Sequence, residues 1–311
     1  MSVRNRLRNG RQLKFEQCES RIALAGDVAI ALEGTLLNVT GDNLGNEINI
    51  TQSDAGNVTI RGLNGTTVNG LPAVTLLNPG LEKLDIRMGD GNDRVTVGRV
   101  SLEGDLNVDL GTGNDFVAVG ARVANNVSII GDAGSDQANV NNAIIRGDLV
   151  VDLGQDAGRV VLNNTSVGFN ATIITDAGND VITSNGLIVG GNLSVESKAG
   201  NDSVTLINGS AFALGITTDL GDDRVSLSNY SSTEDLNIET GDNNDRVTLT
   251  SVTSSKSINI NTDSGNDTII ATNVRAALDA VLAGGAGFDA FDDNGFFGTT
   301  KTEVKEIESF I

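Results

Sequence analysis

Apolar and polar positions alternate along most of the chain and repeat every 21 or 22 residues. The stretch from Asp109 to Val119 shows one unit. A Gly-Asn-Asp turn is followed by a strand in which Val117 and Val119 share one face. Two residues after the aspartate, every repeat has an apolar residue: Val95, Val117, Ala138, Val160, Ile182, Val204, Val225, Val247, Ile269 and Phe291. The positions seven and nine residues before it are also apolar throughout. Each repeat therefore predicts two β-strands with inward apolar side chains.

A third, looser apolar position lies between these strands and indicates a three-sided coil. Its members are Val100 and Leu102, Val123, Ile144, Val167, Ile188, Phe212 and Val252. A fixed period of this length is typical of a solenoid, in which each repeat buries its apolar face against its neighbours. We predict an all-β fold, a right-handed parallel β-solenoid or β-helix of about ten coils. At about 4.8 Å per coil the rod is about 50 Å long.

The segments outside the repeats predict a cap at each end. Residues 26–80 alternate without the long period and contain the turn pairs Asn64-Gly65 and Asn69-Gly70, which indicates an N-terminal β-hairpin cap over the first coil. The repeats occupy 81–290. Residues 291–311 form the expected C-terminal cap. Around it lie Phe288, Phe291, Phe296, Phe297 and Phe310, out of 9 Phe in the chain.

Charge is divided unevenly along the chain. The formal net charge is −20, but residues 1–25 carry about +4, which leaves about −24 on the rest. Such an acidic body repels nucleic acid and anionic membrane surfaces and attracts cations. Nucleic acid is therefore not expected as a partner, and no apolar run is long enough to predict a membrane span. The single cysteine, Cys18, excludes an internal disulfide.

Residues 1–25 form a basic leader without the apolar core of an ordinary signal peptide. The leader resembles the LEPR-XLL leader of planctomycete bacteria. The matching residues are Leu13, Phe15, Glu16, Glu19, Arg21, Leu24, Ala25, Gly26 and Asp27, whereas Cys18, Ser20 and Ala23 depart from the pattern. The resemblance implies an exported protein, at the cell surface or extracellular, and no particular activity. The alternative is a disordered basic tail on a cytosolic protein.

One acidic position recurs in phase with the apolar ones. Its members are Asp93, Asp115, Asp136, Asp180, Asp202, Asp223, Asp245, Asp267 and Asp289, with Gly158 in the one vacant place. Because the aspartate has the same parity as the inward residue two positions later, its carboxylate is expected to point into the corner. Like charges about 5 Å apart repel, and more strongly when buried. The column of nine aspartates therefore requires either a cation or dense hydrogen bonding.

Calcium is the first of these two solutions, because it takes six to eight oxygen ligands. The corner also resembles the RTX calcium repeat, G-G-x-G-x-D-x-U-x, which Gly284–Phe291 fits fully. The coils of Asp93 and Asp115 fit it without the first glycine. Elsewhere the match weakens, because the second glycine is replaced by Asp132, Asp176, Asp219, Asp263 or Lys198. We therefore predict calcium as the cofactor, with the nine aspartates as metal ligands. Lys198 opposes a cation in its own coil.

The alternative is metal-free. The aspartates then accept hydrogen bonds from N–H groups of the corner. The preceding asparagines stack as an amide ladder: Asn92, Asn114, Asn179, Asn201, Asn244 and Asn266.

Composition weighs against catalysis. The chain has no His, no Trp and one Tyr, and therefore lacks the commonest general base and most of the aromatic surface that stacks on sugars. The outward positions are too irregular for ice binding. We predict a non-catalytic, exported structural or adhesive β-solenoid stabilised by calcium. A metal-free structural solenoid and a polysaccharide-active enzyme are the alternatives. The expected partners are cations, with other cell-surface proteins, polysaccharide or self-association as further options.

Overall fold

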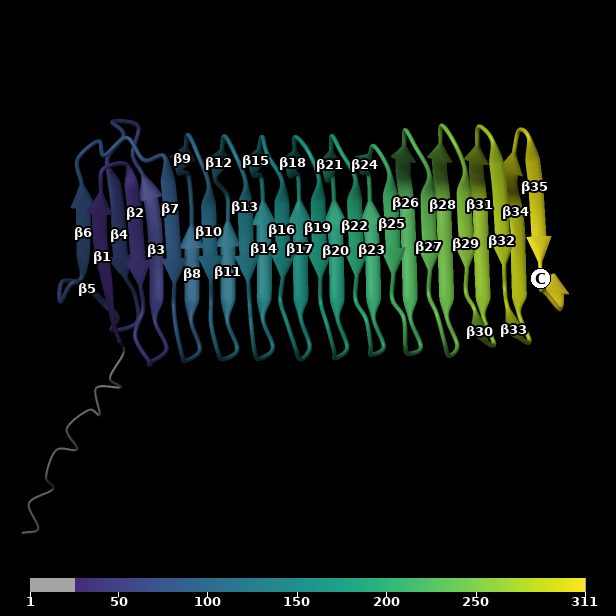
Figure 1. The fold of residues 1–311 in the computed structure, drawn as a ribbon, viewed down its shortest axis with the longest axis horizontal. Coiled ribbons are helices and arrows are strands. Elements are labelled where there is room, and N and C mark those ends of the chain that lie inside the picture. The colour runs from purple at the N-terminus through teal and green to yellow at the C-terminus, as the bar shows by residue number, and fades with distance from the viewer. Residues whose placement is uncertain (1–25, 311) are drawn as a thin grey trace, which may run out of the picture.

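The computed structural model describes residues 26–310, which form an all-β rod without a helix (Figure 1). The strands lie across the rod axis and fall into a 14-stranded, a 20-stranded and a 2-stranded sheet. The basic leader of residues 1–25, with Cys18, lies outside the described residues. The predicted parallel β-solenoid of about ten coils is confirmed.

The first sheet contributes one strand to each coil. Its coil strands are β7 (Lys83–Arg87), β10 (Leu106–Asp109), β13 (Val127–Ile130), β16 (Leu149–Asp152), β19 (Ala171–Ile174), β22 (Leu193–Glu196), β25 (Leu214–Thr217), β27 (Leu236–Glu239), β29 (Ile258–Asn261) and β32 (Asp279–Ala283). All of these pairs are parallel and follow the sequence period, so that Val108 lies between Ile86 and Ile129. Equivalent residues of successive coils therefore stack on each other.

The second sheet contributes a longer and a shorter strand to each early coil. The longer strands are β8 (Arg94–Val97), β11 (Phe116–Val119), β14 (Gln137–Asn141), β17 (Arg159–Asn163), β20 (Val181–Asn185) and β23 (Ser203–Ile207). The shorter ones are β9 (Ser101–Leu102), β12 (Arg122–Val123), β15 (Ile144–Ile145), β18 (Ser166–Val167), β21 (Ile188–Val189) and β24 (Ser210–Ala211). In later coils the two merge into β26 (Arg224–Ser232), β28 (Arg246–Ser254), β31 (Thr268–Ala276) and β34 (Ala290–Gly298).

The bend between the longer and the shorter strand is made by one residue with a left-handed backbone. This residue is asparagine in five coils, with φ between 49° and 55°: Asn142, Asn164, Asn208, Asn229 and Asn273. Asparagine enters this region more readily than other residues with a side chain, because its short amide can bond locally. The asparagine column therefore sets the third side of the coil.

The core lies between the two sheets and is continuous along the rod. The residues two positions after each aspartate, from Val95 to Phe291, are all buried, as are Ile86 and Leu282 from the other strand. At the third apolar position the sequence analysis is partly wrong. Ile144, Ile188 and Phe212 are 38%, 54% and 45% exposed, whereas their neighbours Ile145, Val189 and Ala211 are buried. In each case two apolar residues are adjacent, and strand alternation turns only one of them inward.

Six further strands, which include antiparallel pairs, lie beside the first coil. They are β1 (Asp27–Glu33), β2 (Leu36–Thr40), β3 (Glu47–Gln52), β4 (Val58–Gly62), β5 (Thr67–Val68) and β6 (Ala73–Leu76). The strands β2 and β3 pair in parallel with β7 and β8, and β1, β4 and β6 add antiparallel pairs outside them.

At the other end of the rod, β35 (Lys301–Lys305) and β36 (Ser309–Phe310) continue the parallel pairing, and β30 (Ser264–Gly265) pairs with β33 (Ala286–Gly287). The assignment of the two end regions as caps stays a prediction. Among the described residues, no helix is long and apolar enough to cross a membrane.

Candidate functional site

The nine aspartates form one buried column along a corner of the rod. Each lies just before the longer strand of the second sheet, and each is between 0% and 3% exposed. The inward orientation expected from their parity is therefore confirmed. Because the coils stack in register, each carboxylate lies beside the corner backbone of the neighbouring coil.

One oxygen of each carboxylate joins two successive coils. The N–H of Asp93 donates to Oδ1 of Asp115 at 2.6 Å, and the N–H of Asp115 donates to Oδ1 of Asp136 at 2.8 Å. The same bond recurs from Asp180 to the end of the column. The series begins with the N–H of Asn46, which donates to Asp93 at 2.6 Å, and ends with the N–H of Asp289, which donates to Glu308 Oε2 at 2.7 Å.

The column is interrupted at one coil. Gly158 donates its N–H to Oδ1 of Asp180 at 2.5 Å, but it has no side chain to accept from the N–H of Asp136. The remaining bonds form a hydrogen-bonded series on each side of this gap, which we call the aspartate ladder. The hydrogen-bonding role proposed for these residues as an alternative to calcium is thus present in the structure.

The second oxygen of each carboxylate, Oδ2, is buried without a hydrogen-bond partner in all nine aspartates. An isolated charge in such surroundings is costly, and burial therefore favours the neutral acid. Burial, reinforced by neighbouring carboxylates, raises the pKa of Asp115, Asp136 and Asp245 to about 7. Burial also raises the pKa of Asp93 and Asp180 to about 6. At mildly acidic pH the ladder is therefore largely uncharged.

The two halves of the ladder differ in what lies beside the carboxylates. Five residues before the aspartate, the first coils have apolar residues such as Met88 and Leu110, whereas later coils have hydroxyls. Thr175 and Ser197 lie beside Asp180 and Asp202, where their hydroxyls partly offset the rise in pKa that burial causes. The later half of the ladder is thus lined by polar groups.

A second ladder at the same corner runs in the opposite direction. Oδ1 of Asn92 accepts from the N–H of Asn114 at 2.9 Å, and Oδ1 of Asn114 accepts from the N–H of Ser135 at 2.8 Å. Later coils repeat this bond. The asparagines were expected to bond chiefly to one another. Instead each accepts mainly from the backbone of the following coil, while each aspartate accepts from the preceding one.

Close packing explains the glycine that precedes most of the aspartates by two positions. Gly113 has φ +141°, and a Cβ at this residue would lie 1.8 Å from the carbonyl oxygen of Gly91. Gly200 has φ +147°, and a Cβ there would lie 1.5 Å from the oxygen of Gly178. Any side chain would collide with the coil below. This glycine of the RTX-like pattern is therefore required by the stacking of coils, with or without a metal.

The aspartate side chains alone offer fewer free oxygens than calcium takes. Calcium takes six to eight oxygens, whereas each aspartate has one oxygen engaged with a backbone N–H and one orphaned Oδ2. Within residues 26–310, no group of three or more acidic or other metal-ligating side chains lies close enough to hold a metal ion. The residues fit a hydrogen-bonded ladder better than a metal centre. Calcium binding by the nine aspartates stays a prediction.

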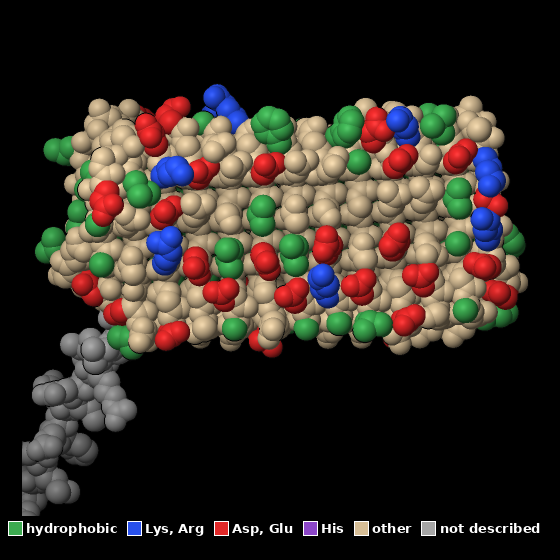
Figure 2. Space-filling view, in the orientation of Figure 1, with side chains coloured by type: hydrophobic (Ala, Val, Ile, Leu, Met, Phe, Trp, Pro, Cys, Tyr) green, Lys and Arg blue, Asp and Glu red, His purple; other side chains and the backbone are tan. Residues whose placement is uncertain are grey.

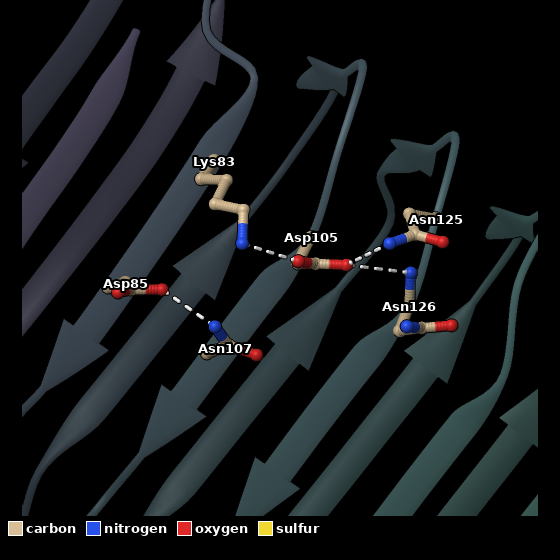
Figure 3. Close-up of polar contacts among 6 residues, drawn as sticks. All are labelled: Lys83, Asp85, Asp105, Asn107, Asn125 and Asn126. Carbon is tan, nitrogen blue, oxygen red and sulfur yellow. Dashed lines mark hydrogen bonds and ion pairs between the residues drawn. The ribbon is translucent and has the colours of Figure 1, made fainter. Parts of the chain in front are cut away.

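A further ladder, which the sequence analysis missed, lies at the opposite corner before the first-sheet strands. Asp105 binds Lys83 Nζ at 2.8 Å and accepts from Asn125 Nδ2 at 2.5 Å (Figure 3). Oδ1 of Asn126 accepts from the N–H of Asp148 at 2.9 Å, and the series continues through Asn170 and Asn192. The signal was available, because these residues keep the 21 or 22 residue spacing immediately before the buried leucine column.

No family model, curated protein or solved structure matches this chain.

Proposed function

We propose that this chain is a non-catalytic structural or adhesive rod that acts outside the cell or at its surface. The observation that carries the proposal is the continuity of the coil-to-coil bonding. Strand ladders on two sheets and side-chain ladders at two corners join nearly every coil to the next. A fold in which each repeat is bonded to its neighbours all along its length suits the transmission of load.

The position of the acidic residues supports a non-catalytic role over a polysaccharide-active enzyme. A general acid or base must come within hydrogen-bond reach of its substrate. The carboxyls whose pKa is raised into the neutral range point into the core, and Asp115, Asp136 and Asp245 are at most 3% exposed. Their perturbed pKa is accounted for by burial inside the rod, and no substrate reaches them there.

The same residues support a metal-free rod over one stabilised by calcium. The N–H bonds of the aspartate ladder already occupy one oxygen per coil. Burial raises the pKa of Asp180 to about 6, so in mild acid its carboxyl is largely neutral and the repulsion that would otherwise call for a cation is reduced. Calcium remains the second candidate because nine buried Oδ2 atoms have no partner.

Export is proposed from the resemblance of residues 1–25 to the LEPR-XLL leader, together with the absence of cysteine after Cys18. The test is protease treatment of intact cells that express the full chain, with an internal protein as the control for lysis. An exported rod is digested, or is recovered in the medium, while the internal control stays whole. Protection of the rod in intact cells and its digestion only after lysis would contradict the proposal.

A further inference from the structure

The two broad faces of the rod carry opposite charges. Between β8 and β31, the strands of the second sheet contain no Asp or Glu. On the side that the longer strands form, they hold four exposed arginines: Arg94, Arg159, Arg224 and Arg246. Arg122 and Arg275 lie beyond the bend, on the third side of the coil. We call the outer surface of the longer strands the arginine face. The coil strands of the first sheet, from β7 to β32, contain Lys83 and Arg87 but six acids: Asp85, Asp109, Asp152, Glu196, Glu239 and Asp279. We call that surface the acidic face.

Figure 2 shows the acidic face, with acidic side chains along the whole rod and few basic ones. In a chain with a net charge of −20, the separation of arginine onto one face is not a consequence of composition.

The arginines of the arginine face mostly lack a partner within the described chain. Every lysine among residues 26–310 lies within 4.0 Å of a carboxylate: Lys83, Lys198, Lys256, Lys301 and Lys305. On the arginine face only Arg94 has such a partner, Glu47 at 3.7 Å, and Arg94 also covers the ring of Phe116. The other three arginines of this face form no ion pair with the described residues, and neither do Arg122 and Arg275.

Two of these arginines are placed unfavourably for an isolated rod. Arg224 and Arg246 are partners in register on neighbouring strands, about 4.8 Å apart along the axis. Like charges opposite each other on neighbouring strands are destabilising. They line a shallow hollow of about 470 Å³ together with the hydroxyls of Ser203, Ser226 and Thr248. Two cations beside hydroxyl donors, with no anion of their own, are suited to carboxylates from another molecule.

We propose that the arginine face binds the acidic face of a second copy of this chain. The inference rests on the proposed structural role and names the partner. Both faces repeat with the same coil spacing, and their charges are complementary. Ten coils about 4.8 Å apart, crossed by strands of about five residues, give a face of about 800 Å², which is what one partner contributes to a stable interface. On the acidic face, Ile130 and Val150 are exposed and add apolar contact.

Contact between two different faces has a structural consequence. The interface is heterologous, so each bound copy leaves one arginine face and one acidic face free. Rods therefore stack side by side into an open array and do not stop at a closed dimer. The net negative charge of the two rods opposes this stacking at long range. At about 0.1 M salt the Debye length is about 10 Å, so salt screens this distant repulsion more than it screens the arginine–carboxylate pairs in contact.

The test is sedimentation of the full chain as salt and surface charge are varied. At about 0.1 M salt, we expect the average mass of the wild type to rise at least about twofold with protein concentration. At about 1 M salt the Debye length is about 3 Å, and we expect the wild type to be monomeric. The triple variant Arg159→Glu, Arg224→Glu, Arg246→Glu is expected to be monomeric at both salt concentrations. The matched control replaces the same three residues with Lys and keeps the association. Circular dichroism verifies that each variant is folded.

A charge swap distinguishes contact between faces from an effect of net charge. The variant Asp109→Lys, Asp152→Lys, Glu239→Lys is also expected to be monomeric alone, and to associate when it is mixed with the arginine-to-glutamate variant. A monomeric wild type, or an arginine-to-glutamate variant that associates like the wild type, overturns the proposal. A monomeric wild type that binds polygalacturonate through these arginines also overturns the proposal, because the arginine face would then bind an acidic glycan. In all three cases a single rod at the cell surface would still satisfy the proposed function, which the protease experiment tests separately.

Discussion

The substitution of Asp115 separates the two roles of a ladder aspartate, hydrogen-bond acceptor and buried acid. Burial raises the pKa of this carboxyl from its usual 3.8 to about 7. The folded chain therefore holds the proton more tightly than the unfolded chain. At 1.36 kcal/mol per pKa unit, this difference corresponds to about 4 kcal/mol. The stabilisation is fully present below about pH 4 and is lost as pH rises through about 7, so the rod is expected to be more stable in mild acid than at pH 8.

Two replacements of Asp115 give different expectations. Asparagine keeps an oxygen that accepts from the N–H of Asp93 and cannot ionise. We expect Asp115→Asn to change the free energy of unfolding by less than about 1 kcal/mol at pH 4 and to raise it at pH 8, by up to about 4 kcal/mol. Alanine removes the acceptor, and we expect Asp115→Ala to cost about 1–3 kcal/mol at pH 4.

The assay is denaturant unfolding followed by circular dichroism between pH 4 and pH 8. Asp54→Asn, at an exposed turn residue, is the control for a change of charge alone. The reasoning is refuted if Asp115→Asn destabilises the rod at pH 8, or if it costs as much as Asp115→Ala at pH 4. A wild type that gains stability from pH 4 to pH 8 would refute it as well.

Three further outcomes follow from the same structure. Gly158→Asn supplies the missing acceptor, and its Cβ would meet only side-chain atoms, at 3.2–3.4 Å. This variant should stabilise the rod by about 1 kcal/mol in denaturant unfolding. In contrast, Gly200→Ala should destabilise the rod, because its Cβ would lie 1.5 Å from the backbone of the neighbouring coil. Tyr230→Phe removes a buried hydroxyl without a hydrogen-bond partner and should leave stability equal or higher in the same assay, whereas Tyr230→Ala should cost about 3–5 kcal/mol. Excess calcium and excess chelator should give the same melting temperature for the full chain, and a melt raised by many degrees in calcium would restore the metal-site interpretation.

The repeat spacing made most of the fold predictable. Residues such as Val117 and Ile86 recur in phase, and a constant period leaves parallel stacking as the arrangement that buries all of them. The inward direction of Asp115 followed from the same parity. Where two apolar residues were adjacent, as at Ile144 and Ile145, the pattern fitted either choice. There the left-handed backbone of Asn142 sets the direction of the shorter strand, and the third apolar position was assigned incorrectly.

The partners of the side chains were harder to predict than their directions. The sequence showed that Asp115 and Asn114 repeat, but not that one accepts from the preceding coil and the other from the following coil. That distinction depends on the exact path of the corner backbone. The outward direction of Arg224 follows from its place directly after the aspartate column, but its separation from Glu239 depends on the folding of the coil, which places the two residues on different sheets.

Carboxyl carbon NMR of the aspartates, recorded as a pH titration with and without calcium, tests the buried, metal-free ladder directly. The account predicts a set of aspartate signals that titrate near pH 6 to 7, remain unchanged when calcium is added, and lose one member in Asp115→Asn. Aspartate signals that all titrate near the usual pKa of 3.8, or that shift on addition of calcium, would contradict it.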